Sequence, residues 1–378
     1  MNKIETALQF VKKIVKEQLG LELVFREKTS VNFFPQSMKV GDVYEINYNR
    51  DIELLLWLYN MVFYDKNISS LAITHYLLYY ACMDKEIYDK AALHLQTFEE
   101  ILAGISYDEE INDIIVNQLS FIMLHEIFHI IFKDRPDTKE QGFDFERRRQ
   151  NEIKKGLAEM FKTITPEKLI ANPKVQSRIK ALDNSLIPKC IRTRNASHIA
   201  KNLVLPEDYE KKVLGDDYRL LEELVCDRSA WQFIMGVCRS NDISKEEMFD
   251  VHLSLLVALT AVFVDTAFMS YYFPNKHHGL QYDDKAIVIR QNSFKRLDID
   301  IPVEYTKEVS KRYQDITVFV EGVLQNTINS FMCYAKELNG IYEGEGCKRK
   351  PDNEKRKLLE DKMEKVIDSI KSRSTSYD

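Results

Sequence analysis

The sequence lacks several features that would assign it to a common class of protein. Its six cysteines are scattered and form no C-x-x-C pair, which excludes a cysteine zinc site of the usual spacing and a small disulfide framework. We therefore expect reduced thiols and a cytoplasmic protein. With only 12 glycines and 9 prolines in 378 residues, collagen-like and disordered classes are excluded and a helix-rich globular protein is favoured.

The chain also lacks an excess of positive charge. Its formal net charge is -6 at pH 7 and its isoelectric point is near 5.9, so it has no electrostatic footprint for nucleic acid. The local run Arg147-Arg148-Arg149 is typical of a solvated helix face. We expect no nucleic-acid partner.

No segment of the sequence predicts export or membrane insertion. The first twenty residues carry charges throughout, which indicates an amphipathic helix and not a signal peptide. The most apolar window, residues 253 to 273, approaches membrane-spanning length but contains Asp265. Because a charge at the bilayer centre costs at least about 2.5 kcal/mol, a buried core helix is favoured and no membrane partner is expected.

The pattern of the remaining segments predicts a mainly α protein with a small β element. Residues 43–49 alternate as a strand does, and proline-free apolar helices are predicted over 51–64, 68–82 and 85–103. We expect a single domain over 1–344 and a charged, solvated helix or tail over 345–378. Within the domain, short helices and loops are expected as an insertion over about 135–215, where they would form a lid or specificity region. Further along, we expect irregular and partly extended chain over 285–304 and a long helix near 305–338.

The stretch "FIMLHEIFHIIF", residues 121 to 132, places two histidines and a glutamate in an otherwise apolar helix. Residues four apart share a helix face, so His125 and His129 can direct two imidazoles at one point, with Glu126 beside them. This HExxH spacing suits tetrahedral Zn²⁺, and the glutamate can act as a base toward water. A chance match would usually lie on a solvated face, whereas unpaired histidines in an apolar helix are costly. The pattern therefore predicts a metal site.

Two histidines leave such a site one protein ligand short, and "LLEELVCDRSAWQFI" offers the candidates. Glu223 and Asp227 lie four apart on the apolar face of a predicted helix, whereas Glu222 lies on a more polar side. We expect Glu223 to be the third ligand and Asp227 to accept a hydrogen bond from a ligand imidazole. The alternative is a surface ion pair between Asp227 and Arg228.

"HEIFH" followed by "ELVCDR" resembles the gluzincin metallopeptidases, in which an HExxH helix is followed by an E-x-x-x-D helix. Among these the chain looks most like the Lit-type phage-exclusion peptidases. The resemblance implies a helical zincin-like domain in which the HExxH helix packs against the ExxxD helix. It also implies that His125, His129 and Glu223 are zinc ligands, that Glu126 is the general base and that Asp227 supports a ligand.

The segment "FPNKHHG", residues 273 to 279, follows the apolar helix. His277 or His278 could donate to the oxyanion of a tetrahedral intermediate and would then be catalytic. The alternative is an exposed loop, and the pattern favours neither.

These observations together predict a cytoplasmic zinc metallopeptidase that hydrolyses a peptide bond in a protein or peptide substrate. The resemblance to phage-exclusion peptidases implies a role in antiviral defence and a host protein as the substrate. Two alternatives stay open. One is a regulatory or toxin-like binding protein that uses the metal to hold its fold, and the other is a membrane-embedded gluzincin.

Overall fold

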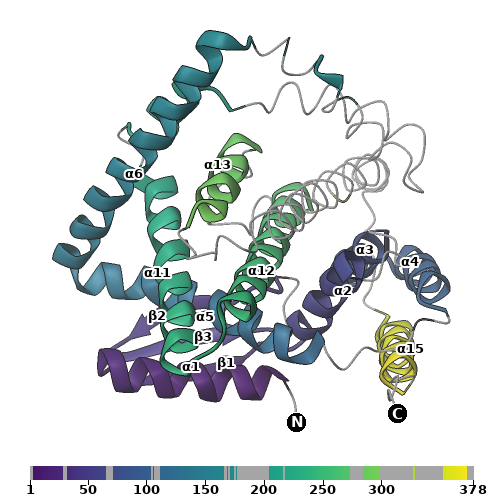
Figure 1. Cartoon of the computed structure of the whole chain (residues 1–378). Helices are drawn as coiled ribbons and strands as arrows, with labels where there is room; N and C mark the ends of the chain where they lie inside the picture. Colours follow the sequence, from purple (N-terminus) through teal and green to yellow (C-terminus); the bar gives the residue numbers. More distant parts are fainter. Residues whose placement is uncertain are drawn as a thin grey trace.

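The computed structural model of the chain describes residues 3–28, 32–64, 71–103, 105, 111–165, 168, 171–173, 176, 204–215, 218–272, 284–297, 327 and 352–372. Within these residues the protein is mainly helical and has one small three-stranded sheet, so the predicted fold class is confirmed at this level (Figure 1). In chain order the helices are α1 (Lys3–Leu19), α2 (Ile52–Tyr64), α3 (Leu71–Asp84), α4 (Tyr88–Ile101), α5 (Ile111–Asp134), α6 (Pro136–Thr163), α10 (Pro206–Lys212), α11 (Tyr218–Ser240), α12 (Lys245–Tyr272), α13 (Asp284–Lys295) and α15 (Asn353–Lys371).

The sheet comprises β1 (Leu23–Glu27), β2 (Gln36–Val40) and β3 (Val43–Tyr48) in the order β1-β3-β2. β3 is central and pairs with β1 in parallel and with β2 in antiparallel orientation. Gly41, in the turn between β2 and β3, has a φ of 63°, a value that favours glycine. The strand predicted over 43–49 is confirmed by β3, and β1 and β2 flank it.

Helix α5, which carries the HExxH sequence, lies at the centre of the molecule. It contacts α1, α2, α6, α11 and α12 on its several sides and also contacts β2 and β3. Other elements surround α5 along most of its length, and its sequence is apolar nearly all round because few of its side chains meet water. The buried amides of Asn60 and Gln118 bond reciprocally and tie α2 to α5, and Gln118 also donates to the Ser254 carbonyl of α12.

Among the described residues, two helices are long and apolar enough to cross a membrane, Asp113–Asp134 and Lys245–Ser270. Most of each apolar window is buried inside the protein, 72% for the first and 83% for the second. The core helix of a soluble protein passes the same test, so these helices are weak evidence for a membrane. α12 begins after a capping box, in which Ser244 and Glu247 bond each other's backbone amides.

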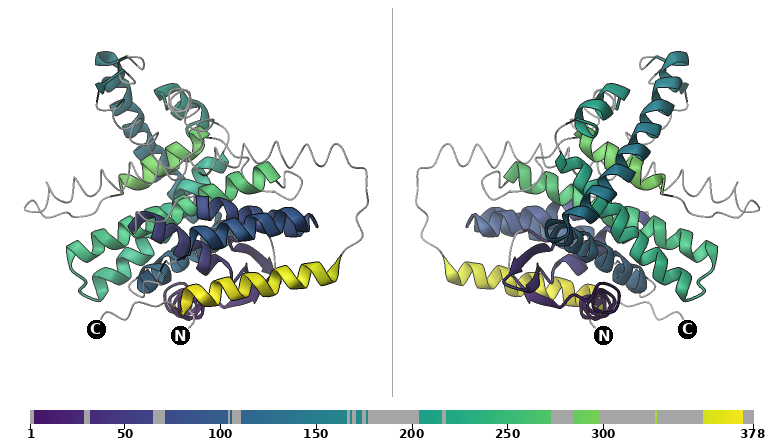
Figure 2. Two further views of the ribbon diagram at one scale, coloured as in Figure 1. Left: turned by 90° about the vertical axis from the view of Figure 1, so that its right-hand side faces the viewer. Right: turned by 90° about the vertical axis from the view of Figure 1, so that its left-hand side faces the viewer.

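Helix α6 corrects the expectation of short helices and loops after residue 135. Residues 136–163 form one helix of 28 residues. Its polar sequence is rich in good helix formers, and ion pairs at i,i+3 such as Glu152–Lys155 and Glu159–Lys162 support its exposed faces. The end of α6 at Thr163 extends away from α5 and the sheet (Figure 2).

Helix α13 corrects the expectation of irregular chain over 285–304, which is wrong for residues 284–295. The β-branched run "AIVI" favours extended chain, but packing overrides this local preference. Ile287, Ile289 and Phe294 are buried against the core, and α13 contacts both α11 and α12. Residues 298–304 and most of the predicted helix at 305–338 lie outside the described residues.

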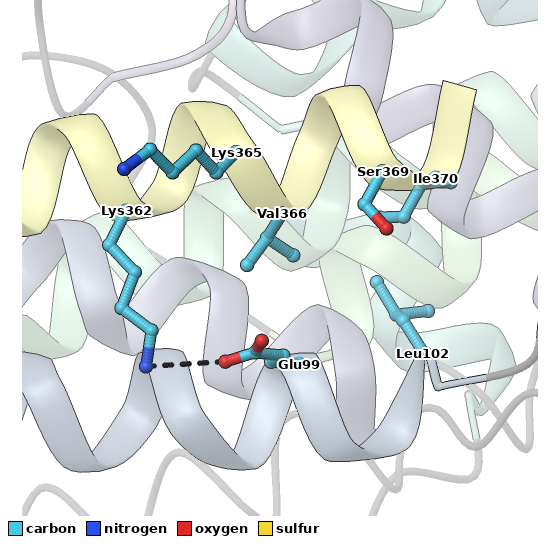
Figure 3. Close-up of a pocket in the computed structure, with 7 residues that line it drawn as sticks. All are labelled: Glu99, Leu102, Lys362, Lys365, Val366, Ser369 and Ile370. Carbon is cyan, nitrogen blue, oxygen red and sulfur yellow. Dashed lines mark ion pairs between the residues drawn. The ribbon is translucent and has the colours of Figure 1, made fainter. Parts of the chain in front are cut away.

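Near the end of the chain, α15 is a helix as predicted, but it is not solvated on all sides. Leu359, Met363, Val366 and Ile370 are buried, and the helix packs along α4. Between the two helices lies a small pocket, where Lys362 forms an ion pair of 3.2 Å with Glu99 (Figure 3). The pocket is lined only from the side of α4 and from α15, so it belongs to neither α5 nor α11.

Candidate metal centre

The HExxH residues occupy one side of the middle of α5. His125 is buried, whereas Glu126 and His129 are partly exposed. The rings of His125 and His129 lie 4.9 Å apart between centroids, as expected for residues one helical turn apart. Ile127 and Phe128 are buried in the core, and this apolar packing fixes the helix that presents the histidines.

Helix α11 brings three carboxylates to the same place, because it packs directly on α5. Leu220, Leu221 and Leu224, which lie beside the carboxylate positions in the sequence, are buried and anchor this part of the helix. Glu223 and Asp227 lie one turn apart, so both reach the histidine side of α11. The structure therefore packs the HExxH helix against the ExxxD helix.

Donor atoms from three residues form a small triangle between α5 and α11. The Nε2 atoms of His125 and His129 are 3.2 Å apart. Glu223 Oε2 lies 3.3 Å from Nε2 of His125, and Oε1 lies 3.5 Å from Nε2 of His129. Among the described residues this is the one group of histidine, cysteine or acidic side chains that is placed to hold a metal ion.

Each histidine directs its other ring nitrogen to a different carboxylate. His125 Nδ1 lies 2.9 Å from Asp227 Oδ1, which is the predicted support. His129 Nδ1 lies 3.0 Å from Glu222 Oε1, a contact that the sequence interpretation missed. A hydrogen bond from Nδ1–H to a carboxylate fixes the tautomer and leaves Nε2 free to bind a metal. Both imidazoles are therefore arranged as ligands through Nε2.

A cationic side chain stands behind each of the supporting carboxylates. Arg290 of α13 donates from Nε and Nη2 to Asp227, at 2.9 and 2.8 Å, and its Nη1 lies 2.8 Å from Glu223 Oε2. Lys139 of α6 donates from Nζ to Glu222 Oε2 at 2.5 Å. The alternative prediction of a surface pair between Asp227 and Arg228 is wrong, since Asp227 is buried and Arg228 pairs with Glu146.

Burial and charge shift the pKa values of the site in opposite directions. Burial acts to lower the pKa of His125, but its hydrogen bonds and charge interactions with Asp227 and Glu223 outweigh burial and raise it to about 10. The hydrogen bond from His129, opposed by burial and aided by Lys139, lowers the pKa of Glu222 to about 2. Burial acts to raise the pKa of Glu223, but the charge of Arg290 overcomes it and the pKa falls below its ordinary value. The donor set therefore contains ionised carboxylates, and without a metal His125 carries a proton.

Glu126 faces the sheet side of the site. Its Oε2 accepts a hydrogen bond of 3.4 Å from the Ser37 hydroxyl of β2. β2 is the edge strand, which pairs with β3 on one side and with no described strand on the other. Two residues along β2, Lys39 bonds Asp134 at the end of α5 at 2.5 Å, so this strand is fixed beside the histidines at two points.

The structure brings the predicted residues His125, His129, Glu223 and Asp227 together, and Glu126 lies on the same helix as the two histidines. His277 and His278 lie outside the described residues. Glu222, Lys139 and Arg290 were missed; the adjacent pair of glutamates signals two carboxylates on neighbouring faces of one helix, whereas no local pattern points to Arg290.

Comparisons with known proteins give no relative for this chain: no family, no curated protein and no solved structure matches it. Its function is therefore argued from the site itself.

Proposed function

We propose that the protein is a zinc-dependent metallopeptidase that hydrolyses a peptide bond in a protein substrate. The observation that carries this proposal is the triangle formed by His125, His129 and Glu223, with Glu126 next to a ligand on the same helix. Two imidazoles and one carboxylate are the ligand set of one class of catalytic zinc site.

The separations within the triangle support zinc. Ligand atoms placed 2.0–2.1 Å from a tetrahedral ion lie about 3.3–3.4 Å from one another. The Nε2 atoms of the two histidines are 3.2 Å apart, and the two carboxylate oxygens of Glu223 lie 3.3 Å from one and 3.5 Å from the other, so the spacing of the donor groups is close to that around a zinc ion. Thiolate is absent from this set, and the nearby thiol of Cys226 contacts His129 Nδ1 and not the Nε2 side.

The exposure of the donors supports a reacting site over a structural one. The side chains of His129 and Glu223 are 17% and 20% exposed, so the triangle has an open side. A structural zinc site is closed by four protein ligands, whereas a catalytic site keeps one position for water or substrate. With three protein donors and an open side, the arrangement favours hydrolysis.

Glu126 is the residue that we assign to proton transfer. A zinc ion held by the triangle would supply Lewis acidity toward the scissile carbonyl and lower the pKa of water. Glu126 then takes the proton from the attacking water and delivers it to the leaving amine. Ser37 donates to Glu126 and restrains its carboxylate.

The edge strand β2 supports an extended peptide as the substrate. Its outer edge offers backbone amides and carbonyls that no described strand uses, and an extended peptide can pair with such an edge by main-chain hydrogen bonds. Because Ser37 of β2 contacts Glu126, a peptide aligned on this strand would pass the catalytic residues.

The biological setting of the proposal rests on the resemblance of "HEIFH" and "ELVCDR" to the gluzincins and to the Lit-type phage-exclusion peptidases. On that basis the substrate is a host protein, the role is antiviral defence and the site of action is the cytoplasm. The burial of α5 and α12 within the protein is consistent with this location.

The test is a comparison of new protein termini in cells that express wild type or Glu126→Gln. Terminal-peptide proteomics should find cleavage products in the wild-type cells alone, and they identify the substrate. A metal-stabilised binding protein without peptidase activity predicts the same termini in both samples together with an unchanged biological effect of the variant. That outcome would contradict the proposal.

A further inference from the structure

Helix α6, from the region inserted after α5, reaches the metal site at a point not assigned by the proposed function. α6 begins at Pro136, two residues after α5 ends, and runs along α11 (Figure 1). Lys139, in the first turns of α6, donates a hydrogen bond to one carboxylate oxygen of Glu222, and the other oxygen of Glu222 lies 3.0 Å from Nδ1 of His129. A three-member chain thus leads from α6 to a metal-binding imidazole.

A second chain leads from α6 to the other imidazole by way of α13. Arg149 donates to the hydroxyl oxygen of Ser293 at 2.9 Å and also to its carbonyl oxygen, and Gln150 donates to the same hydroxyl at 2.6 Å. Ser293 lies one turn from Arg290, which holds Asp227 and Glu223. α6 is therefore hydrogen-bonded to α13, which also packs on α11 and α12, and α13 supplies the cation behind His125.

The contacts that hold α6 in place are largely polar. Two of its four buried side chains, Glu146 and Gln150, are polar and have no exposed surface. Glu146 lies against Arg149 at 2.8 Å and against Arg228 of α11 at 3.3 Å. Buried ionic networks contribute little net stability but specify one arrangement. This interface is therefore better suited to placing α6 than to strengthening the core.

The close approach of α6 to α11 also depends on a glycine. A Cβ added at Gly142 would lie 2.8 Å from a methyl carbon of the buried Val225, so a larger residue there displaces either the Val225 side chain or one of the helices. Gly142 lies between Lys139 and Glu146 on the side that faces α11. Gly142 thus sets the spacing of α6 and α11 close to the contacts that link Lys139 through Glu222 to His129.

We propose that α6 is a positioning element of the metal site, in which Lys139 acts through Glu222 on His129 and Arg149 acts through Ser293 and Arg290 on Asp227. This inference rests on the proposed function and extends it to the inserted region. It has a regulatory consequence: a ligand or protein that moves α6 lowers the affinity of the site for zinc without touching a zinc ligand.

Lys139→Met tests the first chain, because it removes the charge and keeps most of the apolar stem. The matched control is Lys155→Met on the same helix, whose lysine pairs with Glu152 on the exposed face. The measurements are the zinc dissociation constant, by competition with a chelator, and thermal unfolding of the metal-free protein. We expect Lys139→Met to weaken zinc binding about tenfold, the lower end of the range for residues that support a ligand, and Lys155→Met to leave it unchanged.

A double-mutant cycle separates positioning from general stability. If Lys139 acts through Glu222, the Lys139→Met change should have less than about a twofold effect in a Glu222→Gln background. Arg149→Met should also weaken zinc binding, and Arg148→Met, which removes an exposed side chain bonded only along its own helix, should not. Equal zinc affinity in wild type and Lys139→Met, or an undiminished effect in the Glu222→Gln background, would overturn the inference. Failure of the wild type to bind zinc would instead contradict the proposed function itself.

Discussion

Two pairs of neighbouring histidines among the described residues have opposite chemistry. His125 and His129 lie on one helix and face Glu222, Glu223 and Asp227. His75 of α3 and His94 of α4 also approach closely, with their Nδ1 atoms 3.0 Å apart. Burial lowers the pKa of His75 to about 4, whereas the carboxylates raise the pKa of His125 to about 10.

The comparison shows that proximity of two imidazoles does not make a metal site. The His75–His94 pair joins α3 to α4 within the core, and no third donor completes it among the described residues. At α5 and α11 the third donor and the supporting carboxylates are present, and each has a cationic partner. The carboxylates on α11 are therefore the feature that separates the candidate metal site from a packing contact.

The largest effect is expected for Glu126→Gln. Gln keeps the size of the side chain but cannot take and deliver a proton, so hydrolysis should fall by about 10²- to 10⁴-fold. Zinc content should stay at the wild-type level, because Glu126 is not a donor of the triangle. The rate of cleavage is compared at equal zinc loading, and full activity of the zinc-loaded variant would remove the peptidase assignment while leaving the metal site intact.

The three carboxylates of α11 should rank by their contact with the donor triangle. Glu223→Ala removes a ligand and should weaken zinc binding most. Asp227→Ala and Glu222→Ala each remove the acceptor behind one imidazole, so each should lose about 10- to 100-fold in affinity. Chelator competition gives the three dissociation constants. Equal losses for all three would mean that Glu223 is not the ligand.

Zinc affinity should fall with decreasing pH, by about tenfold per unit from His125 alone, because zinc must displace its proton at any pH below about 10. In the metal-free protein the pKa of His125 is raised from its ordinary value of 6.5 to about 10. The charged His125 imidazolium therefore contributes its full stabilisation of the fold below pH 6.5, and this stabilisation is lost as the pH rises toward 10. The increase in Tm on adding zinc should therefore grow between pH 6 and 9. An increase that is the same at every pH would show that His125 is not a ligand.

The smallest effect on zinc is expected at the other histidine pair. His75→Gln should leave zinc content and zinc affinity unchanged. Its effect should be on stability, a loss of about 1–3 kcal/mol from a buried polar contact left incomplete, measured by denaturant unfolding. A loss of zinc from this variant would make the two pairs alike and would contradict the distinction drawn between them.

Much of the metal site could be predicted because its signals are local. His125 and His129 lie one turn apart, as do Glu223 and Asp227, and helical periodicity alone places each pair on one face. Glu222 was assigned to a more polar side of the helix than Glu223, but it meets His129 and Lys139. Arg290 could not be predicted, since packing of α13 on α11 and α12 brings it to the site and its own sequence favours extended chain.

The fold shows the same division. Apolar helices such as α5 and α12 were predicted from length and composition. β1 and β2 were not, because both strands are short and exposed along most of their length, so burial imposes little apolar pattern on their sequences. α6 was predicted as short pieces because its sequence is polar, although polar residues with strong helix propensity form long helices when one face is held by a neighbour.

The most direct test of the account is the zinc content of the purified wild-type protein beside that of a His125→Ala, His129→Ala double variant, measured by elemental analysis after dialysis at neutral pH. We expect about one zinc per chain in the wild type and none in the variant. A wild-type protein that is isolated without metal and takes up no zinc when it is supplied would contradict the proposal that His125, His129 and Glu223 bind zinc.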